Sequence, residues 1–399
     1  MQVDDSLASS STRYLTSAAS SAPPSLQPYF ARFSDLYSKK LYYQLLLSVQ
    51  EFYAHPESDK PGSTLRYEFF TKFVINWKDK VSGLSGAELA IAAAKQLKEP
   101  SKALDFLSKQ RDELPDKTPP HLLVSMECTH YKLLLGELET VKKDVDQGGK
   151  VLNNYDAVEK VVSGGYYRVA AEYYKAKALY QQYYTSSLLY LACLPHNGTE
   201  DDLLEEEKVE RAHDLAIAAI LGQGIWNFGE LILHPLLPTL NSTPHAYLLA
   251  LLSAFSSGSL PLFDSLLPSI QSHPLLSASM PFLRQKICLM ALVESVSKRE
   301  ARQRSLSFET IAKETALPVD EVEHLCMKAL SLSLIKGSLD QSAQVAHISW
   351  VQPRVLEMDQ LKALRAKLAN WLSRVKDTEI FVENEGSAGN KNVVEAVVV

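Results

Sequence analysis

Glycine is scarce in this sequence of 399 residues, which contains 16 glycines, whereas average usage would give about 28. This scarcity argues against glycine-rich phosphate loops and β-barrels, and it favours helices joined by short turns. Gly222-Gln-Gly224 begins like a dinucleotide-binding fingerprint, but Asn227 stands where the third glycine is required. Gly149-Lys150 lacks the preceding glycine of a P-loop. The sequence therefore predicts no nucleotide site.

Closely spaced cysteines and histidines are also missing. The four cysteines form no Cys-x-x-Cys pair, which argues against a disulfide framework and a zinc ribbon. We interpret them as buried thiols in a reducing compartment. The ten histidines form no His-Glu-x-x-His or His-x-His motif, and there is no Gly-x-Ser-x-Gly elbow. We therefore predict no metal, no cofactor and no catalytic site. The cysteines are Cys128, Cys193, Cys288 and Cys326.

Long apolar runs and an excess of positive charge are absent as well. No segment reaches the roughly 18 uncharged apolar residues that a membrane span requires. The Ser-rich N-terminus carries Asp4 and Asp5 and resembles neither a secretory nor a transit signal. Lys and Arg number 41 against 47 Asp and Glu, a net charge of −6, which argues against a nucleic-acid-binding protein. We predict a cytoplasmic and nuclear location, with no membrane and no nucleic acid as partner.

The sequence is rich instead in helical periodicity. Residues 1–27 contain few large apolar side chains and are predicted to be disordered. Over residues 28–277, apolar positions recur with a helical period in stretches of roughly 12 to 20 residues. This pattern predicts a mainly α protein that begins with a curved, TPR-like solenoid of stacked helix pairs. The predicted breaks between helices are Pro61-Gly62, Pro115, Pro119-Pro120, Gly148-Gly149 and Gly164-Gly165.

One stretch of this region, residues 166–190, alternates tyrosines with alanines. Large rings beside small residues let neighbouring helices approach closely. A platform for stacking single-stranded bases is the alternative, but it needs interleaved basic residues, and only Arg168, Lys175 and Lys177 occur here. We therefore predict that these rings pack between helices.

Residues 278–352 show the element order of a winged helix with a small β-sheet. An apolar helix ends in the basic run 298–304, and Ser307 is the predicted N-cap of the next helix. A further helix starts at Val319, and two β-like runs follow over 334–339 and 345–351. In DNA readers the helix that starts at Val319 would enter the major groove.

Acidic side chains on that helix argue against DNA reading. Asp320, Glu321 and Glu323 outnumber the single lysine of residues 319–328 and would repel phosphate. Contact of the basic run with RNA is the alternative. A winged helix that does not bind DNA still offers a strand edge, and we expect the 345–351 run to pair with a neighbouring protein. The candidate contact residues on the strands are Ile335, Gly337, His347, Ile348 and Trp350.

Residues 355–382 are predicted to form a final amphipathic helix, followed by a flexible tail over 383–399. Lys and Arg occupy the face opposite its apolar stripe. The stripe is too apolar to remain in water, so we predict that it binds a helical partner. Its residues are Met358, Leu361, Leu364, Leu368, Trp371, Leu372 and Val375.

This layout of helical repeats, winged helix and C-terminal amphipathic helix resembles the PCI family, with a PCI module over roughly residues 170–352. Members of that family are scaffold subunits of the proteasome lid, the COP9 signalosome and a translation initiation factor. Several local motifs are similar to those of the proteasome-lid members. These motifs are Gly222–Pro235, Leu306–Ala312, Val322–Leu330, Leu334–Ser338 and Trp350–Val355.

The resemblance implies a non-catalytic scaffold subunit in the lid of the 19S regulatory particle of the 26S proteasome. It implies a hetero-oligomer with other PCI-domain and MPN-domain subunits, and a helical arm near a ubiquitin-receptor subunit. The winged helices of PCI subunits would lie side by side, and the C-terminal helix would join a bundle of several subunits. Ubiquitin cleavage and ATP hydrolysis would belong to other subunits. A scaffold of the COP9 signalosome or of the initiation factor, and an RNA-binding winged helix, are the alternatives.

Overall fold

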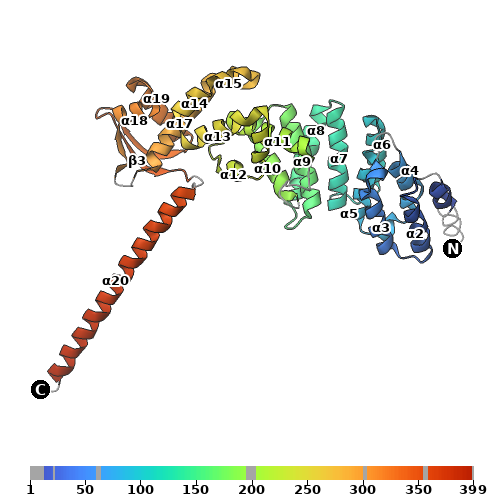
Figure 1. The fold of residues 1–399 in the computed structure, drawn as a ribbon, viewed down its shortest axis with the longest axis horizontal. Helices are drawn as coiled ribbons and strands as arrows, with labels where there is room; N and C mark the ends of the chain where they lie inside the picture. Colours follow the sequence, from blue (N-terminus) through green and yellow to red (C-terminus); the bar gives the residue numbers. More distant parts are fainter. Residues whose placement is uncertain are drawn as a thin grey trace. The chain divides into compact units, whose positions relative to one another are not determined.

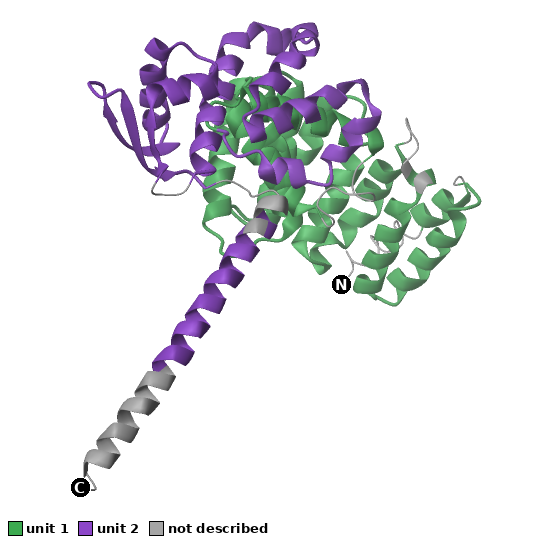
Figure 2. Ribbon diagram, turned by 60° about the vertical axis from the view of Figure 1, so that its left-hand side comes forward, with its two compact units in different colours: residues 1–224 green, residues 225–399 purple. Residues whose placement is uncertain are grey.

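The computed structural model describes residues 13–20, 23–59, 64–194, 204–299, 303–353 and 358–397. The chain divides into two compact units, residues 1–224 and 225–399 (Figure 2). Helices dominate both units, and a small antiparallel sheet lies in the second. This is the predicted fold class of helical repeats followed by a winged helix.

Unit 1 consists of helices in which each packs against its neighbours along the chain (Figure 1). Helix α9 contacts α7, α8 and α10, and α10 contacts α11. Such successive contacts are those of stacked helical repeats. After a helix at residues 13–20, the helices are α2 (Gln27–Ser38), α3 (Tyr42–Ala54), α4 (Leu65–Lys72), α5 (Gly83–Ala94), α6 (Pro100–Asp112), α7 (Pro119–Leu134), α8 (Leu138–Asn153), α9 (Lys160–Ala176), α10 (Tyr180–Cys193) and α11 (Glu205–Leu221), with 3-10 turns at Pro56–Asp59, Val74–Asn76 and Lys78–Lys80.

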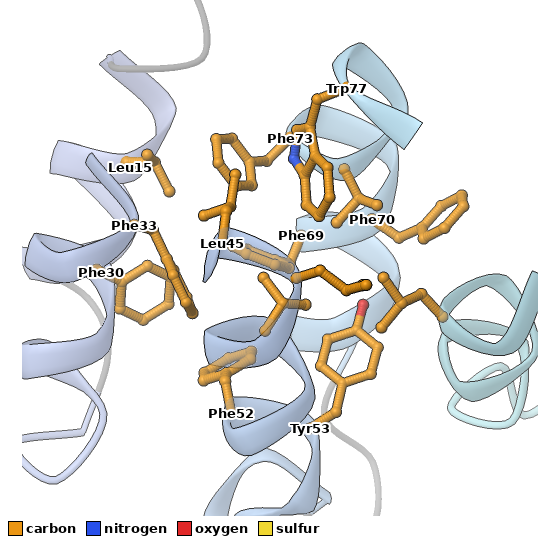
Figure 3. Packing of buried hydrophobic residues seen from close by; sticks show 14 of the residues in the cluster. Leu15, Phe30, Phe33, Leu45, Phe52, Tyr53, Phe69, Phe70, Phe73 and Trp77 are labelled. Atoms are coloured by element: carbon orange, nitrogen blue, oxygen red, sulfur yellow. The ribbon is translucent and has the colours of Figure 1, made fainter. Parts of the chain in front are cut away.

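An aromatic cluster forms the core of the first helices (Figure 3). The rings of Phe33 and Phe52 meet edge to face with centroids 5.7 Å apart, a favourable arrangement for buried rings. Leu15 and Ala18, on the helix at residues 13–20, are buried against this cluster. The predicted disorder of residues 1–27 is therefore wrong for residues 13–20, where Tyr14 and Ala19 also pack against the cluster. Residues 1–12 lie outside the described residues.

Two glycine pairs that we interpreted as breaks lie inside helices instead. Gly148 and Gly149 belong to α8, and Gly165 belongs to α9. A Cβ atom at Gly149 would lie 2.8 Å from the Tyr166 hydroxyl oxygen, and one at Gly165 would lie 2.8 Å from a methyl group of Leu123. These glycines permit close packing between helices rather than turns, at a cost in helix propensity.

The tyrosines of α9 and α10 pack between helices, as predicted. Tyr173, Tyr183 and Tyr184 are buried, and Tyr166 packs against the small apolar cluster around Val141. Burial raises the pKa of Tyr166 and Tyr183 to about 12. Rings placed in this way contribute to the core and are not free to stack on bases.

Unit 2 is built around the long helix α17 (Met280–Ser297), which packs against α13, α14, α18 and β3. Leu283, Ile287 and Val293 are among its buried side chains. The other elements are α12 (Gly229–Leu233), α13 (Tyr247–Ser257), α14 (Leu260–Ser265), α15 (Leu267–Ser272), α16 (Pro274–Ala278), β1 (Ser305–Ser307), α18 (Phe308–Thr315), α19 (Val319–Ser331), β2 (Ile335–Asp340), β3 (Val345–Val351) and α20 (Met358–Val397), with 3-10 turns at Leu237–Ser242 and Pro244–Ala246.

The winged helix has the predicted element order, with one strand that sequence reasoning missed. The side chain of Ser307 accepts a hydrogen bond from the Thr310 backbone N–H, which confirms Ser307 as the N-cap of α18. The missed strand, β1, is three residues long and pairs with β3. It is too short to show a periodic pattern of its own. Helix α20 runs to Val397, beyond the predicted end at residue 382.

Candidate protein-interaction surfaces

Helix α20 carries a row of exposed apolar side chains. Leu364 is 43% exposed, Leu368 54% and Trp371 66%. Steps of three and four residues separate Leu361, Leu364, Leu368, Trp371 and Val375, which is the spacing of a coiled-coil seam. A seam of this kind gains stability only when a second helix covers it. We call these five residues the α20 seam.

Exposed apolar side chains continue along α20 beyond the predicted stripe. Leu372, a member of that stripe, is exposed beside the seam, and Ile380, Phe381 and Val382 are exposed farther along the helix. Sequence reasoning missed the last three because they stand together and break the three-and-four spacing. The side chain of Met358, the first residue of the predicted stripe, lies outside the described residues. The opposite face is basic and exposed, with Lys362, Arg365, Lys367, Arg374 and Lys376.

The second candidate surface is the edge of the sheet, whose strand order is β1-β3-β2. Ser305–Ser307 pairs with one side of β3, and β2 pairs with the other. The expectation that residues 345–351 offer the free edge is therefore wrong for Val345–His347, which pair with β1 on one side and with β2 on the other. Within the described residues, the outer edge of β2 pairs with no strand. An unpaired edge presents backbone N–H and C=O groups that a strand of another chain can bind.

The sheet residues singled out in the sequence separate into two groups. Ile335 and Ile348 are buried in the core of the winged helix. Gly337 follows a shift in the pairing register, and a Cβ there would lie 2.0 Å from the carbonyl oxygen of His347. His347 and Trp350 are exposed. The structure thus leaves His347 and Trp350 available for contacts, whereas the other three residues build the sheet.

Both exposed residues are held in place by a neighbouring strand. His347 Nδ1 lies 2.9 Å from Ser305 Oγ on β1. The Nζ atom of Lys336 lies 4.9 Å from the centre of the Trp350 ring, within the range of a cation–π interaction. These contacts fix the two rings on the solvent side of the sheet, where a partner can reach them.

Helix α19, which corresponds to the groove-reading helix of DNA-binding winged helices, presents an acidic and apolar surface. Asp320 and Glu321 are exposed in its first turn, and Met327 is 51% exposed. Carboxylates at this position repel phosphate, whereas a flexible methionine suits contact with a protein. The geometry of α19 therefore favours a protein partner.

Two of the cysteine thiols are buried and held in the neutral form. Burial raises the pKa of the Cys128 and Cys326 thiols to about 11, which keeps both neutral at physiological pH. No group of three or more His, Cys, Asp or Glu side chains is arranged there to hold a metal ion. Among the described helices, none has the length and apolarity needed to cross a bilayer.

Helical repeats, a winged helix with an unpaired strand edge and an exposed amphipathic helix define a PCI-type protein. Two family models match the chain: PSD13 N-terminal repeats over residues 29–252 and the PCI domain over residues 267–350. The chain is 36% identical to the probable 26S proteasome regulatory subunit rpn9 of Schizosaccharomyces pombe, covering 96% of this chain and 99% of the relative. It is 33% identical to 26S proteasome non-ATPase regulatory subunit 13 homolog A of Arabidopsis thaliana, covering 91% and 95%.

These matches run almost from end to end, and the chain belongs to the family of 26S proteasome non-ATPase regulatory subunit 13. A match to eukaryotic translation initiation factor 3 subunit M of Drosophila sechellia, 36% identical, covers only 18% of this chain and 19% of the relative. The similarity to the initiation-factor subunit is therefore limited to one segment and does not extend over the two whole proteins.

Proposed function

We propose that this chain is a non-catalytic scaffold subunit of the lid of the 26S proteasome regulatory particle. In that role it supports lid assembly, and through it the ATP-dependent degradation of ubiquitinated proteins. The end-to-end similarity to proteins named as 26S proteasome regulatory subunits supports the proposal most directly. Within the molecule, the single observation that carries it is the exposed α20 seam, because a long helix with such a face requires partners.

In this proposal the chain contacts other subunits through two surfaces. The α20 seam enters a helical bundle with other subunits, and the outer edge of β2 lies against the winged helix of a neighbouring PCI subunit. MPN-domain subunits contribute helices to the same bundle, and residues 28–277 form an arm that projects near a ubiquitin-receptor subunit. Residues 278–352 form the winged helix and residues 355–382 the tethering helix. The assembly is a hetero-oligomer in the cytoplasm and nucleus.

The chain performs no chemistry in this proposal. The neutral thiols of Cys128 and Cys326 support this view, as does the family to which the chain belongs. Scaffolding requires only complementary surfaces, so a purified chain without partners is expected to show no peptidase, deubiquitinase or ATPase turnover.

Purification of the native complex tests the proposal. An affinity tag at the N-terminus, far from α20 in the sequence, is used to isolate the assembly from cells, and native mass spectrometry identifies its subunits. We expect proteasome lid subunits in equal stoichiometry with this chain. Recovery of COP9 signalosome or initiation-factor subunits in their place would show that the scaffold role is right and the assembly wrong. Recovery of the chain alone would contradict both.

A further inference from the structure

The solvent face of the winged-helix sheet contains a shallow hollow of about 550 Å³. Exposed residues of the strands make up most of its lining, and the largely buried Ile348 contributes to it as well. Its lining comes from all three strands and the residue that precedes β1. The lining residues are Arg304, Ser305, Gly337, Ser338, His347, Ile348 and Ser349. Of these seven, Arg304 and His347 are basic, three carry hydroxyl groups and none is acidic.

The hollow is held in shape by contacts between the strands. His347 Nδ1 and Ser305 Oγ lie 2.9 Å apart and link β3 to β1. The Ser349 hydroxyl donates a 3.0 Å hydrogen bond to the backbone oxygen of Lys336 on β2. Gly337 lets β2 approach β3 closely, because a Cβ there would collide with the backbone of β3. The lining groups therefore stand in fixed positions before any ligand arrives, which lowers the entropy cost of binding.

Arg304 is the strongest anion-binding group of this lining. Its backbone oxygen accepts a 3.0 Å hydrogen bond from the Ile348 N–H, which anchors the residue beside β3. Its Nε atom is buried and has no hydrogen-bond acceptor among the described residues. The Arg304 side chain as a whole is only partly buried, and a carboxylate is the best complement for the donors that a guanidinium presents to a ligand.

Charges around the hollow leave this basic character intact. The nearby Asp340 carboxylate accepts hydrogen bonds from the Ser342 hydroxyl and the Ala343 N–H in its own turn. Lys336 adds positive charge beside Trp350 on the same face. The chain as a whole carries a net charge of −6, whereas the lining of the hollow contains basic residues and no acidic ones.

We propose that this hollow binds an acidic segment of a partner protein through its glutamate or aspartate side chains. Arg304 pairs with one carboxylate, the second ring nitrogen of His347 and the Ser338 hydroxyl donate to others, and the small lining residues let the segment approach the sheet closely. A nucleic-acid backbone is a poorer fit, because Asp320 and Glu321 on α19 of the same winged helix repel a polyanion of that length. The proposal stands independently of the lid assembly, since it concerns a different surface from the α20 seam and the β2 edge.

Fluorescence anisotropy with the full chain tests the proposal, using a labelled hexaglutamate peptide at low salt. We expect Arg304→Gln to weaken binding roughly tenfold, the effect of losing one charge-assisted contact. Ser338→Asp, on the exposed part of β2, is expected to weaken it similarly by placing a carboxylate in the hollow. Arg374→Gln, an equal loss of charge on the exposed basic face of α20, is the matched control and is expected to leave the affinity unchanged.

Ser338→Asp keeps the test decisive if Arg304→Gln disturbs folding, which thermal melting of each variant monitors. The proposal is overturned if the peptide does not bind. It is equally overturned if Arg374→Gln lowers the affinity while Ser338→Asp leaves it unchanged, because the peptide then binds the basic face of α20. A single-stranded hexanucleotide that binds more tightly than the peptide, with the same sensitivity to Ser338→Asp, would assign the hollow to nucleic acid instead.

Discussion

The Nζ atom of Lys286 on α17 lies 5.2 Å from the centre of the Phe228 ring, inside unit 2. The rings of Trp226 and Phe282 lie at 5.5 Å and 5.7 Å from the same atom, and the Lys286 side chain is 1% exposed. Burial lowers the pKa of Lys286 to about 7. Lys286 thus fastens the 226–228 segment to the central helix of the unit.

This arrangement predicts a pH dependence of stability. Because the pKa of Lys286 is lowered in the folded state, the unfolded chain binds more protons between pH 7 and the ordinary lysine pKa of 10.5. The free energy of unfolding contributed by this residue therefore rises as the pH is raised from about 7 to 10. Urea unfolding of the native chain and of Lys286→Met across that range measures it. We expect the difference between the two chains to change with pH in favour of the native chain, and parallel curves would contradict the prediction.

Gly337 is predicted to tolerate no side chain. A Cβ atom at this position would lie 2.0 Å from the backbone oxygen of His347, and a backbone atom cannot move aside as a flexible side chain does. We expect Gly337→Ala to reduce the free energy of unfolding by about 3 kcal/mol or more, at the upper end for overpacking. Ser338→Ala, on the neighbouring exposed residue, is the control and is expected to change it by less than about 0.5 kcal/mol. If denaturant titration finds the two variants equally stable, the close approach of the β3 backbone does not exclude a side chain at position 337.

In unit 1, Arg168 on α9 donates a hydrogen bond to the buried carboxylate of Glu127 on α7. Glu127→Gln removes the carboxylate that Arg168 hydrogen-bonds and leaves Glu172 as the other negative charge near the guanidinium. We expect a loss of up to about 3 kcal/mol of stability, the usual effect of breaking a buried pair from one side. Replacing both residues, as Glu127→Met with Arg168→Met, removes the uncompensated charge and is expected to restore most of the loss. A double variant less stable than the single one would show that the pair itself is strongly stabilising.

The sequence predicted the large features of this fold because they rest on repeated patterns. The helical period identified the repeats, and the stripe from Leu361 to Val375 identified an exposed face of α20. Gly148-Gly149 and Gly164-Gly165 were misinterpreted, since a glycine that ends a helix and one that admits a neighbouring helix look alike in a sequence. Only the position of the Tyr166 and Leu123 side chains distinguishes the two uses.

The sheet was harder to predict than the helices. Two strands had a readable alternation, but β1 has three residues, and its pairing with β3 decides which strand lies at the edge. The candidate contact residues chosen from the predicted hairpin therefore included Ile335 and Ile348, whose side chains are buried in the core. The sequence presented Arg304 only as part of a basic run, because all its neighbours in the hollow except Ser305 lie more than 30 residues away in the chain.

The outer edge of β2 is predicted to pair with a neighbouring subunit. Adjacent residues of an antiparallel edge strand direct their N–H groups alternately to the partner strand and to solvent. Proline at position 338 or 339 removes the backbone N–H of that residue. At one of the two positions the lost N–H donates to β3, so Ser338→Pro or Leu339→Pro lowers the melting temperature; at the other position only a donor of the free edge is lost. We expect the variant that keeps its melting temperature to co-purify with less of its winged-helix neighbour in a pull-down. Full recovery of the neighbour with that variant would contradict edge pairing.

The α20 seam is predicted to be required for assembly but not for folding of the chain. Leu364, Leu368 and Trp371 are 43%, 54% and 66% exposed, so their replacement removes no contact on which the core depends. Each side chain would contribute about 1.5 to 3 kcal/mol to the free energy of association when it is fully buried against partner helices. The loss of all three contributions is expected to prevent stable association. We expect the variant with Leu364→Ser, Leu368→Ser and Trp371→Ser to melt like the native chain but to sediment apart from the large complex. Lys362→Ser with Lys367→Ser, on the basic face, is the matched control and should still assemble. If the seam variant sediments with the complex, α20 is not the tether, and the assembly must rely on the winged helix and the helical arm.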